Sequence, residues 1–586
     1  MRQLTALRLT ALALAALLLA PLLTRAQPVP PPPPAPAPVP AVPAEGTTTV
    51  LRLPVYLGET TLDPHAARDA ESFRLLACIY EGLYSQEPGS PLNIQPRLAE
   101  ALPEVSEDGL TWTIRLRKDV KFHNSAWFPE KTRTLRARDV LDSLKRLAAV
   151  GPEASMYWLM QGAVVGLDAY GEAARDSLDF GANDKEVAGL KAVDEHTVQI
   201  KLTRPFGALL SVLAHPCTSI MPRELMNGVG LGCSRLTVGT GPYRLHAIAE
   251  DSLWVLKRFA GYCGELPHYE RVVFFMASDQ ETAFSNFAQK QAMEVSLNVN
   301  STDLMQKKPG SLFAATPCTA EWVPRVGNRF AVFNMQSAIW GALDADGRGL
   351  RRAVSLAFDR AKLIATIQYA PGWAAPSDTL LPPGCEAADL EQNQGWGQTD
   401  ANAAKLALDG TKYKGGVDPA TGKALVLKLE LSASQINRAF AQTLSSALKP
   451  LGITVDAQYV TGAQAARPSG DLRMVGWYLD FPDAQNVLQL WAGRNAGVEA
   501  EFGNHAGYRS ADYDKLYAEF ESLLPVAAGE ARRRELVAAL LQRLEEDRPF
   551  LALAQESLPR MRSTLVQWPQ VPAATYNDVR HIKAQE

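Results

Sequence analysis

The stretch LVLKLELSASQINRAFAQTLSSALKPLGITVDAQYV, residues 425–460, decides the fold class because its hydrophobic period changes twice. Residues 425–432 alternate apolar and polar side chains, which predicts a half-buried strand. Apolar residues then recur four positions apart, as in a helix: Ile436, Phe440, Leu444 and Leu448. Pro450 and Gly452 end that helix, and residues 453–460 return to a strand pattern. A strand, a helix and a second strand predict a βαβ unit with parallel strands.

Strand and helix patterns alternate along most of the remaining chain. Residues 110–123 place apolar side chains on one face of a predicted strand, and residues 137–150 place them on one face of a predicted helix. Other segments are predicted to be strands (196–202, 252–258, 271–277) or helices (511–524, 531–547). A chain of 586 residues can form two or more cores. The sequence therefore predicts an α/β protein with more than one lobe.

Residues 1–26 are predicted to form a secretory signal peptide. The segment MRQLTALRLTALALAALLLAPLLTRAQ has two arginines, an apolar stretch, and small residues at the −3 and −1 places before Gln27. The alternative is a membrane anchor, which needs about 20 apolar residues, but the run is shorter and Pro21 interrupts it. Residues 27–47 form a proline-rich linker in the polyproline II state, either a spacer or a tail left by cleavage. The mature protein is therefore expected in the periplasm or outside the cell.

Composition and cysteine usage exclude some classes of function. The net charge of −4 gives no excess of basic residues for nucleic acid. Export permits disulfides, but the sequence alone cannot pair the six cysteines. We favour a disulfide between Cys217 and Cys233, which flank one loop-like segment. None of the cysteines has CxxC spacing, so a thiol catalyst is not expected.

Catalytic and metal-binding motifs are missing. The eight histidines are scattered without the spacing of HExxH or of a zinc finger, and neither a GxSxG elbow nor a Walker loop occurs. DADGRG (344–349) faintly resembles a calcium loop but lacks its closing glutamate, so a polar surface loop is expected. Asp480 and Asp483 could form a glycosidase pair, although acids three positions apart rarely flank a sugar. We therefore expect no enzyme activity, cofactor or metal.

One carboxylate stands in an unusually apolar run, GWYLDFPDAQNVLQLW (476–491). Burying an unpaired charge costs several kcal/mol or shifts its pKa. Asp480 is therefore exposed, paired inside the protein with a cation such as Arg473, or poised to bind a cation from outside. Asp483 follows a proline and precedes a helical pattern, which suits the cap of a helix starting near Gln485.

Eight segments occur in an order that resembles one family: TLDPH (61–65), YEGLYS (80–85), LAEALPEVSEDGLTWTIRLRKDVKFHNS (98–125), ARDVLDSLKRL (137–147), VGTGPYRL (238–245), LRRAVSLAFDRAKLI (350–364), GWYLDFPDAQN (476–486) and YRSADYDKLYAE (508–519). The chain resembles bacterial extracellular solute-binding protein family 5, the oligopeptide- and dipeptide-binding proteins of ABC transporters, over most of residues 48–560. It departs from the family at Ser125, where a glycine is usual, and by an insertion at 338–349. These departures concern the ligand more than the fold.

The resemblance implies two α/β lobes joined by two hinge strands, with an extra subdomain on the first lobe and a ligand cleft between the lobes. The first lobe is expected at 48–85, 231–284 and 548–586, the extra subdomain at 86–230, and the second lobe at 285–547. VGTGPY is expected to be a turn without ligand contact. In LRRAVSLAFDRAKLI we expect a packed helix, with its arginines structural or solvated.

The implied function is capture of a short peptide and its delivery, by a monomer, to an ABC transporter permease in the membrane. In peptide-binding relatives the aspartate matching Asp480 forms a salt bridge with the ligand's α-amino group. Trp477, Tyr478 and Phe481 would exclude water around it and complete the ligand-binding set. The alternatives are a nickel complex or an oligosaccharide as ligand, a sensory receptor of the same fold, and an exported hydrolase.

We expect the mature protein to begin at about Gln27, because the apolar run ends in a cleavage pattern. N-terminal sequencing of exported material measures the start directly. An intact Met1 recovered in a membrane pellet would contradict the prediction.

Overall fold

A computed structural model describes residues 50–585, except for 57–59, 88–91, 153, 178–184, 231–235, 250–252, 278, 298–315, 368, 370, 392–396, 462–469, 497–502 and 569–578. The predicted signal peptide and nearly all of the proline-rich linker region lie outside the described residues. In the part that is described, no helix combines the length and apolar character that a membrane span needs. Cys217 carries a free, buried thiol, and Cys233 lies outside the described residues, so the favoured disulfide finds no support.

The first sheet joins the start of the described chain to a distant segment. Strand β1 (Val50–Tyr56) pairs in parallel with β10 (Arg271–Ala277), and antiparallel strands β9 (Leu253–Arg258) and β8 (Tyr243–Ala249) follow. Leu51, Leu53 and Val55 of β1 are fully buried. Helix α2 (Ala70–Ile79) follows β1, and the carboxylate of Asp69 caps it by accepting from the Ser72 amide.

The segment between α2 and β8 adds two small sheets and several helices. Strands β2 (Tyr84–Gln86) and β3 (Ile94–Pro96) form one sheet, and β4 (Glu104–Val105), β5 (Thr111–Arg115), β7 (Thr197–Lys201) and β6 (Leu190–Asp194) form the other. The strand predicted over 110–123 is thus shorter, whereas α3 (Ala137–Val150) has the predicted bounds. The remaining helices are α4 (Leu167–Ser177), α5 (Leu209–Val212) and α6 (Arg223–Val229). These elements share one apolar core with the first sheet.

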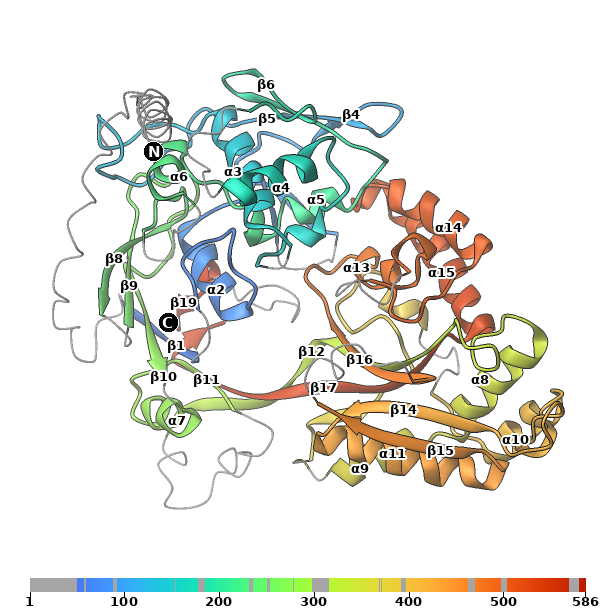
Figure 1. Cartoon of the computed structure of the whole chain (residues 1–586). Helices are drawn as coiled ribbons and strands as arrows, with labels where there is room; N and C mark the ends of the chain where they lie inside the picture. Colours follow the sequence, from blue (N-terminus) through green and yellow to red (C-terminus); the bar gives the residue numbers. More distant parts are fainter. Residues whose placement is uncertain are drawn as a thin grey trace, which may run out of the picture. The chain divides into compact units, whose positions relative to one another are not determined.

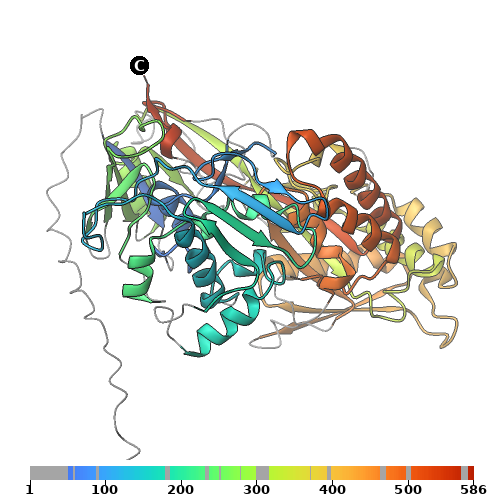
Figure 2. The same cartoon turned by 90° about the horizontal axis from the view of Figure 1, so that it is seen from above.

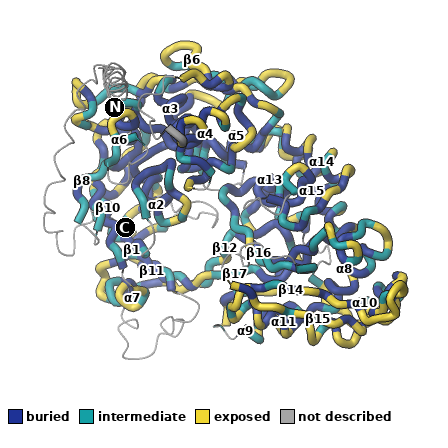
Figure 3. Tube along the Cα trace, viewed as in Figure 1, coloured by how far each residue is buried: buried dark blue, intermediate teal, exposed yellow. Residues whose placement is uncertain are grey.

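The largest sheet contains the predicted βαβ unit. Its order is β11 (Glu294–Ser296), β17 (Phe550–Ser563), β12 (Cys318–Phe333), β16 (Leu472–Tyr478), β14 (Val426–Ser432) and β15 (Thr454–Val460), with β13 (Ala374–Pro376) beside β17. Strands β14 and β15 are parallel, with α11 (Gln435–Leu448) between them, as the sequence predicts. The exposed residues of α11 and of α10 (Ala401–Asp409) lie on the outer side of this layer (Figure 3).

Strands β12 and β17 connect two separate cores (Figure 1 and Figure 2). At one end Cys318 and Met561 pack with Phe275 and Phe287, beside the first sheet and α7 (Gln280–Ala288). At the other end Phe330 packs in a second core with α13 (Gln485–Leu488), α14 (Ala511–Ser522) and α15 (Glu530–Asp547). The register shifts between Pro324 and Asn328, which bends the pair locally. The two long strands therefore carry the chain between two lobes of mixed α/β structure.

Two expectations in the second core region need correction. DADGRG is not a surface loop, because Asp344 caps α8 (Ala345–Ala357) by accepting from the Gly347 amide. The predicted single helix over 350–364 is broken, since α8 ends before Phe358 and α9 (Arg360–Ile367) begins a new helix. Arg351 is fully buried and donates to the carbonyl oxygens of Asp547, Trp340 and Ala342, so it is structural rather than solvated.

The glycines of VGTGPY allow two backbone segments to touch. A Cβ placed on Gly239 would lie 2.0 Å from the carbonyl oxygen of Ile79, and one on Gly241 would lie 2.7 Å from that of Cys78. The buried ring of His123 contacts both, through the Gly239 amide and, at 2.8 Å, the Gly241 carbonyl. These contacts give the segment the structural role that we expected.

A buried ion pair fastens the TLDPH segment to α3. Both carboxylate oxygens of Asp63 accept from the guanidinium of Arg146, at 2.8 and 2.6 Å, and both side chains are almost completely buried. Arg146 holds the pKa of Asp63 below its usual value despite this burial. The motif is therefore a structural link inside the first lobe.

We expect Asp63→Asn to lower the free energy of unfolding by about 3–5 kcal/mol, because it leaves the Arg146 charge buried without its partner. Glu104→Gln is the matched control, since it breaks an ion pair with Arg115 that is mostly exposed and should change stability by less than about 1 kcal/mol. Urea unfolding at pH 7 measures both. Equal effects of the two substitutions would contradict the assigned role.

Candidate ligand-binding site

The segment from Gly476 to Asp483 leaves the large sheet beside the bend in β12. Tyr478 is the last residue of β16 and lies opposite Gly327 of β12. The Leu479 amide then donates to the carbonyl oxygen of Val326 at 2.7 Å. A Cβ on Gly327 would lie 2.4 Å from the Tyr478 ring, so this position has no room for a side chain. Local packing thus fixes the strand end that carries Asp480.

Asp480 is partly exposed, and its contacts are polar but not ionic. Its Oδ2 accepts from Asn486 Nδ2 at 3.0 Å. Asn486 Oδ1 in turn accepts from Trp477 Nε1 at 3.0 Å and from the Asp480 amide at 3.3 Å. Burial raises the pKa of Asp480 to about 6, against the opposite effect of the Asn486 hydrogen bond.

The cationic partner considered for Asp480 is absent among the described residues. Arg473 belongs to β16, and neither it nor any other described basic residue forms an ion pair with Asp480. Of the three possibilities that the sequence leaves open, internal pairing therefore fails. A partly exposed carboxylate with a raised pKa and no cation is what an incoming cation would neutralise.

The aromatic neighbours of Asp480 fall into two groups. Trp477 packs edge to face against Trp158, with ring centroids 5.8 Å apart, and Phe481 is buried in the core shared with the first sheet. Tyr478 points away from both, as alternation along a strand requires, and its hydroxyl donates to Glu556 Oε2 at 2.6 Å. The structure thus joins Trp477 and Asp480 through Asn486, and places Phe481 and Tyr478 in different surroundings.

The Asp480 segment also lies against the first-lobe side of the chain. The Asp480 charge adds to the burial that raises the pKa of the Cys217 thiol, so the two side chains are close. Trp158 and Cys217 both come from residues 86–230, whereas Asp480 and Trp477 come from the large sheet. The carboxylate therefore stands where side chains of the two parts meet.

Asp483 has a different role, although it is only three residues away. Its Oδ1 accepts from the Gln485 amide at 2.8 Å, so the predicted contact at the start of α13 is present, with Ala484 as the formal cap residue. The same oxygen accepts from Arg533 at 2.6 Å, and Arg533 also binds Glu386. All three side chains are buried. This internal commitment of Asp483 argues against a glycosidase pair with Asp480.

Sequence reasoning missed several residues of the site. Asn486 stands in the quoted run but gave no signal of its own. Arg325, Arg329 and Glu556 surround Tyr478 from β12 and β17: Arg329 donates to Glu556 Oε1 at 2.8 and 2.6 Å, and the Arg325 guanidinium lies 4.0 Å from the Tyr478 ring centroid. Strand register brings them together, and no local pattern in the sequence encodes that register.

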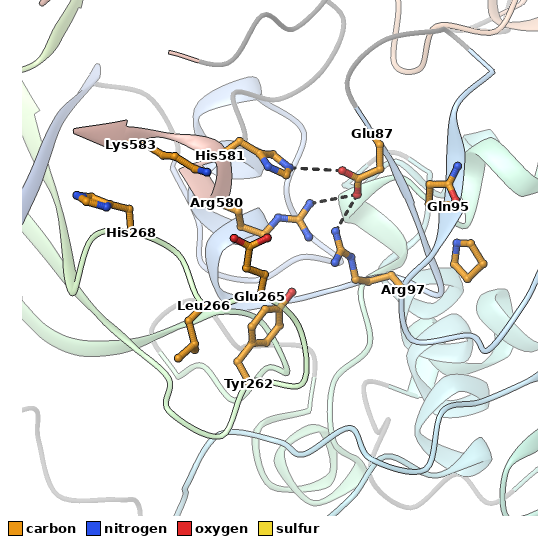
Figure 4. Close-up of a pocket in the computed structure, with 11 residues that line it drawn as sticks. Glu87, Gln95, Arg97, Tyr262, Glu265, Leu266, His268, Arg580, His581 and Lys583 are labelled. Atoms are coloured by element: carbon orange, nitrogen blue, oxygen red, sulfur yellow. Dashed lines mark hydrogen bonds and ion pairs between the residues drawn. The ribbon is translucent and has the colours of Figure 1, made fainter. Parts of the chain in front are cut away.

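A separate pocket of about 550 Å³ lies near the C-terminal segment (Figure 4). Its lining carries both signs of charge, and Glu87 pairs with Arg97 at 2.7 Å, His581 at 3.4 Å and Arg580 at 3.8 Å. These ion pairs hold the pKa of Glu87 well below its usual range. The basic groups therefore already share a carboxylate. Across the described ranges, no group of three histidine, cysteine or acidic side chains could hold a metal ion.

Comparisons with known proteins agree with this architecture. The pattern of the family "Bacterial extracellular solute-binding proteins, family 5 Middle" matches residues 93–498. The glutathione-binding protein GsiB of Salmonella choleraesuis (strain SC-B67) is 27% identical over 349 residues, which cover 59% of this chain and 58% of the relative. The match thus spans less than two thirds of that relative's length.

Solved structures of low sequence identity share the fold. The periplasmic binding protein DppA from Helicobacter pylori, in complex with the peptide STSA, aligns with a TM-score of 0.66 at 20% identity, over 92% of this chain and 99% of that one. The Escherichia coli murein tripeptide binding protein MppA aligns with a TM-score of 0.61 at 18% identity, over 92% and 98%. The fold is that of two-lobed periplasmic binding proteins. The chain belongs to family 5 of the bacterial extracellular solute-binding proteins.

We expect Asp480→Asn to leave the free energy of unfolding at pH 8 unchanged or about 1–2 kcal/mol higher. An acid whose folded pKa is raised to about 6 binds protons more tightly in the folded state, so its ionisation destabilises the fold as pH rises from about 4 to 6. The asparagine variant lacks this loss. Urea unfolding at pH 5 and pH 8 measures the difference, and a loss of several kcal/mol at pH 8 would reveal an internal cation.

Arg533→Gln should behave in the opposite way. It leaves the buried carboxylates of Asp483 and Glu386 together without their cation, and we expect a loss of about 3–5 kcal/mol. Arg532→Gln, on the same helix but half exposed, is the matched control and should cost less than about 1 kcal/mol. If Arg533→Gln were as mild as its control, the three-residue cluster would not support the Asp480 segment.

Proposed function

We propose that the protein is an extracytoplasmic solute-binding protein that captures a short peptide and delivers it to the permease of an ABC transporter. Asp480 binds the peptide's α-ammonium group. The observation that carries this proposal is the carboxylate without a cation, set among aromatic side chains where two parts of the chain meet. The protein acts by binding, without catalysis, cofactor or metal.

The surroundings of Asp480 suit an ammonium group. Trp477 and Phe481 limit water near the carboxylate, and attraction between opposite charges strengthens as the effective dielectric falls. Asn486 holds one carboxylate oxygen, which fixes its direction and leaves acceptor capacity for the ligand. A bound ammonium would stabilise the ionised form of Asp480 and remove the penalty that raises its pKa.

Closure of two lobes around the ligand completes the proposed mechanism. We propose a first lobe of residues 48–85, 231–284 and 548–586, an extra subdomain of 86–230, and a second lobe of 285–547. Strands β12 and β17 would act as the hinge, in the manner of periplasmic binding proteins. The contact of Trp158 with Trp477 supports a ligand position between the lobes.

The relatives favour a peptide over other ligands. One relative is named for glutathione, one structure contains the peptide STSA, and one is of a murein tripeptide binding protein. A nickel complex or an oligosaccharide presents no fixed ammonium group, so neither would use the Asp480 carboxylate in this way. A sensory receptor would use the same site and differ only in the partner that reads the bound state.

We expect Asp480→Asn to weaken binding of free tri-alanine by roughly one to two decades. A charge-assisted hydrogen bond is worth about 1.5–3 kcal/mol. N-acetyl tri-alanine should bind poorly to the wild-type protein and lose little more in the variant, because it has no ammonium group. Calorimetry on the four combinations measures this coupling, with glutathione as a second probe with a free amino group.

Asp512→Asn is the control substitution, since Asp512 is largely exposed and lies on α14, away from the Asp480 segment. It should leave all affinities unchanged. Equal losses for free and acetylated peptide in Asp480→Asn would mean that Asp480 does not bind the amine. Failure of all the free peptides to bind the wild-type protein would contradict the proposed function itself.

A further inference from the structure

Beside Asp480 the sheet carries more positive than negative charge. Arg325 and Arg329 of β12 face a single carboxylate, Glu556 of β17. Glu556 is already fully engaged: Oε1 accepts twice from Arg329, and Oε2 accepts from the Tyr478 hydroxyl. The nearest approach of Arg325 to that carboxylate is 3.7 Å. One guanidinium is therefore in excess over the acidic groups of this cluster.

Arg325 is held in place by stacking rather than by hydrogen bonds. Its guanidinium lies 4.0 Å from the centroid of the Tyr478 ring, a cation–π contact. The Tyr478 ring is itself fixed by its hydrogen bond to Glu556. The side chain of Arg325 remains 38% exposed. Stacking of this kind orients the planar group and leaves its edge donors available to a carboxylate.

The backbone at Arg325 is also fixed. The register shift in β12 falls between Pro324 and Asn328, and a bulge re-aims the side chains that it carries. Gln555 Nε2 donates to the carbonyl oxygens of Arg325 and Gly327 and so secures the bend. Arg325 is thus positioned before any ligand arrives, which reduces the entropy lost on binding.

Arg325 and Asp480 are neighbours in the sheet without being partners. The hydrogen bond from the Leu479 amide to the Val326 carbonyl joins the residues next to them on the two strands. No ion pair between Arg325 and Asp480 forms in the described structure, so each charge keeps capacity for an outside group. One site therefore presents an anion and an excess cation side by side.

We propose that Arg325 binds the ligand's carboxylate, so that the ligand is a zwitterion whose amino and carboxylate groups are both recognised. This inference rests on the proposed function, because it assigns the second pole of a ligand whose ammonium group binds Asp480. A guanidinium binds a carboxylate through two parallel hydrogen bonds. The site consequently selects short peptides with a free C-terminus over their amides.

The test compares the acid and C-terminal amide forms of di-, tri- and tetra-alanine by calorimetry on the full-length mature protein. The wild-type protein should bind the best acid form about tenfold or more tightly than its amide. Arg325→Gln should weaken the acid to near the amide's affinity and change the amide little. Arg325→Lys, which keeps the charge but not the planar fork, should retain part of the preference.

Two controls separate this inference from the proposed function. Arg115→Gln alters an exposed arginine far from the site along the chain and should leave the preference for the acid intact. Asp480→Asn should reduce the affinity for both the acid and the amide and keep their ratio. Equal binding of acid and amide by the wild-type protein would overturn the role of Arg325, even if acetylation still abolishes binding through Asp480. Equal losses for acid and amide in Arg325→Gln would overturn it as well.

Discussion

A carboxylate that is partly removed from water and has no cation is the constraint on which this account of the protein depends. Asp480 lies among Trp477, Leu479 and Phe481, and its only side-chain partner in the described structure is the neutral amide of Asn486. Its raised pKa expresses the free energy that the fold loses by keeping the charge there. A binding protein can recover that free energy when a cationic ligand arrives, which makes the strained charge a source of affinity.

Asp483 shows what the same side chain does when the fold supplies the cation. Arg533 and Glu386 enclose it completely, and its oxygen also secures the start of α13. The two acids thus divide the work of one short segment. Asp483 anchors the segment to α15, and this anchoring holds Asp480 at the junction with Trp158 and Cys217. Fixed geometry at one residue permits an unsatisfied charge at the other.

The sequence predicted local structure well where a single period was decisive. Residues 425–460 alternate and then repeat every four positions, so the strand, helix and strand followed directly, and α3 had its predicted bounds. The break between α8 and α9 was missed because both helices bury apolar residues on a continuous pattern. The DADGRG segment was misread because an acid that caps a helix looks like an acid in a loop.

The site was predictable only in part, for a physical reason. Asp480 stood out because its own neighbours in the chain are apolar. The ion pairs of Asp483 with Arg533, and of Arg329 with Glu556, join residues on different elements. Strand register and helix docking create these pairs, and neither leaves a local trace in the sequence. For that reason Arg325 and Glu556 entered the site only when β12, β16 and β17 were seen together.

Proton release on ligand binding tests the central claim most directly. At pH 6 about half of the Asp480 carboxylates carry a proton if the pKa is about 6, and a ligand ammonium group must displace it. Calorimetry in buffers of different ionisation enthalpy should therefore show about half a proton released per tri-alanine at pH 6. At pH 8 Asp480 should release none, and Asp480→Asn should release none at either pH. A wild-type protein that binds the peptide at pH 6 without releasing protons would contradict the account.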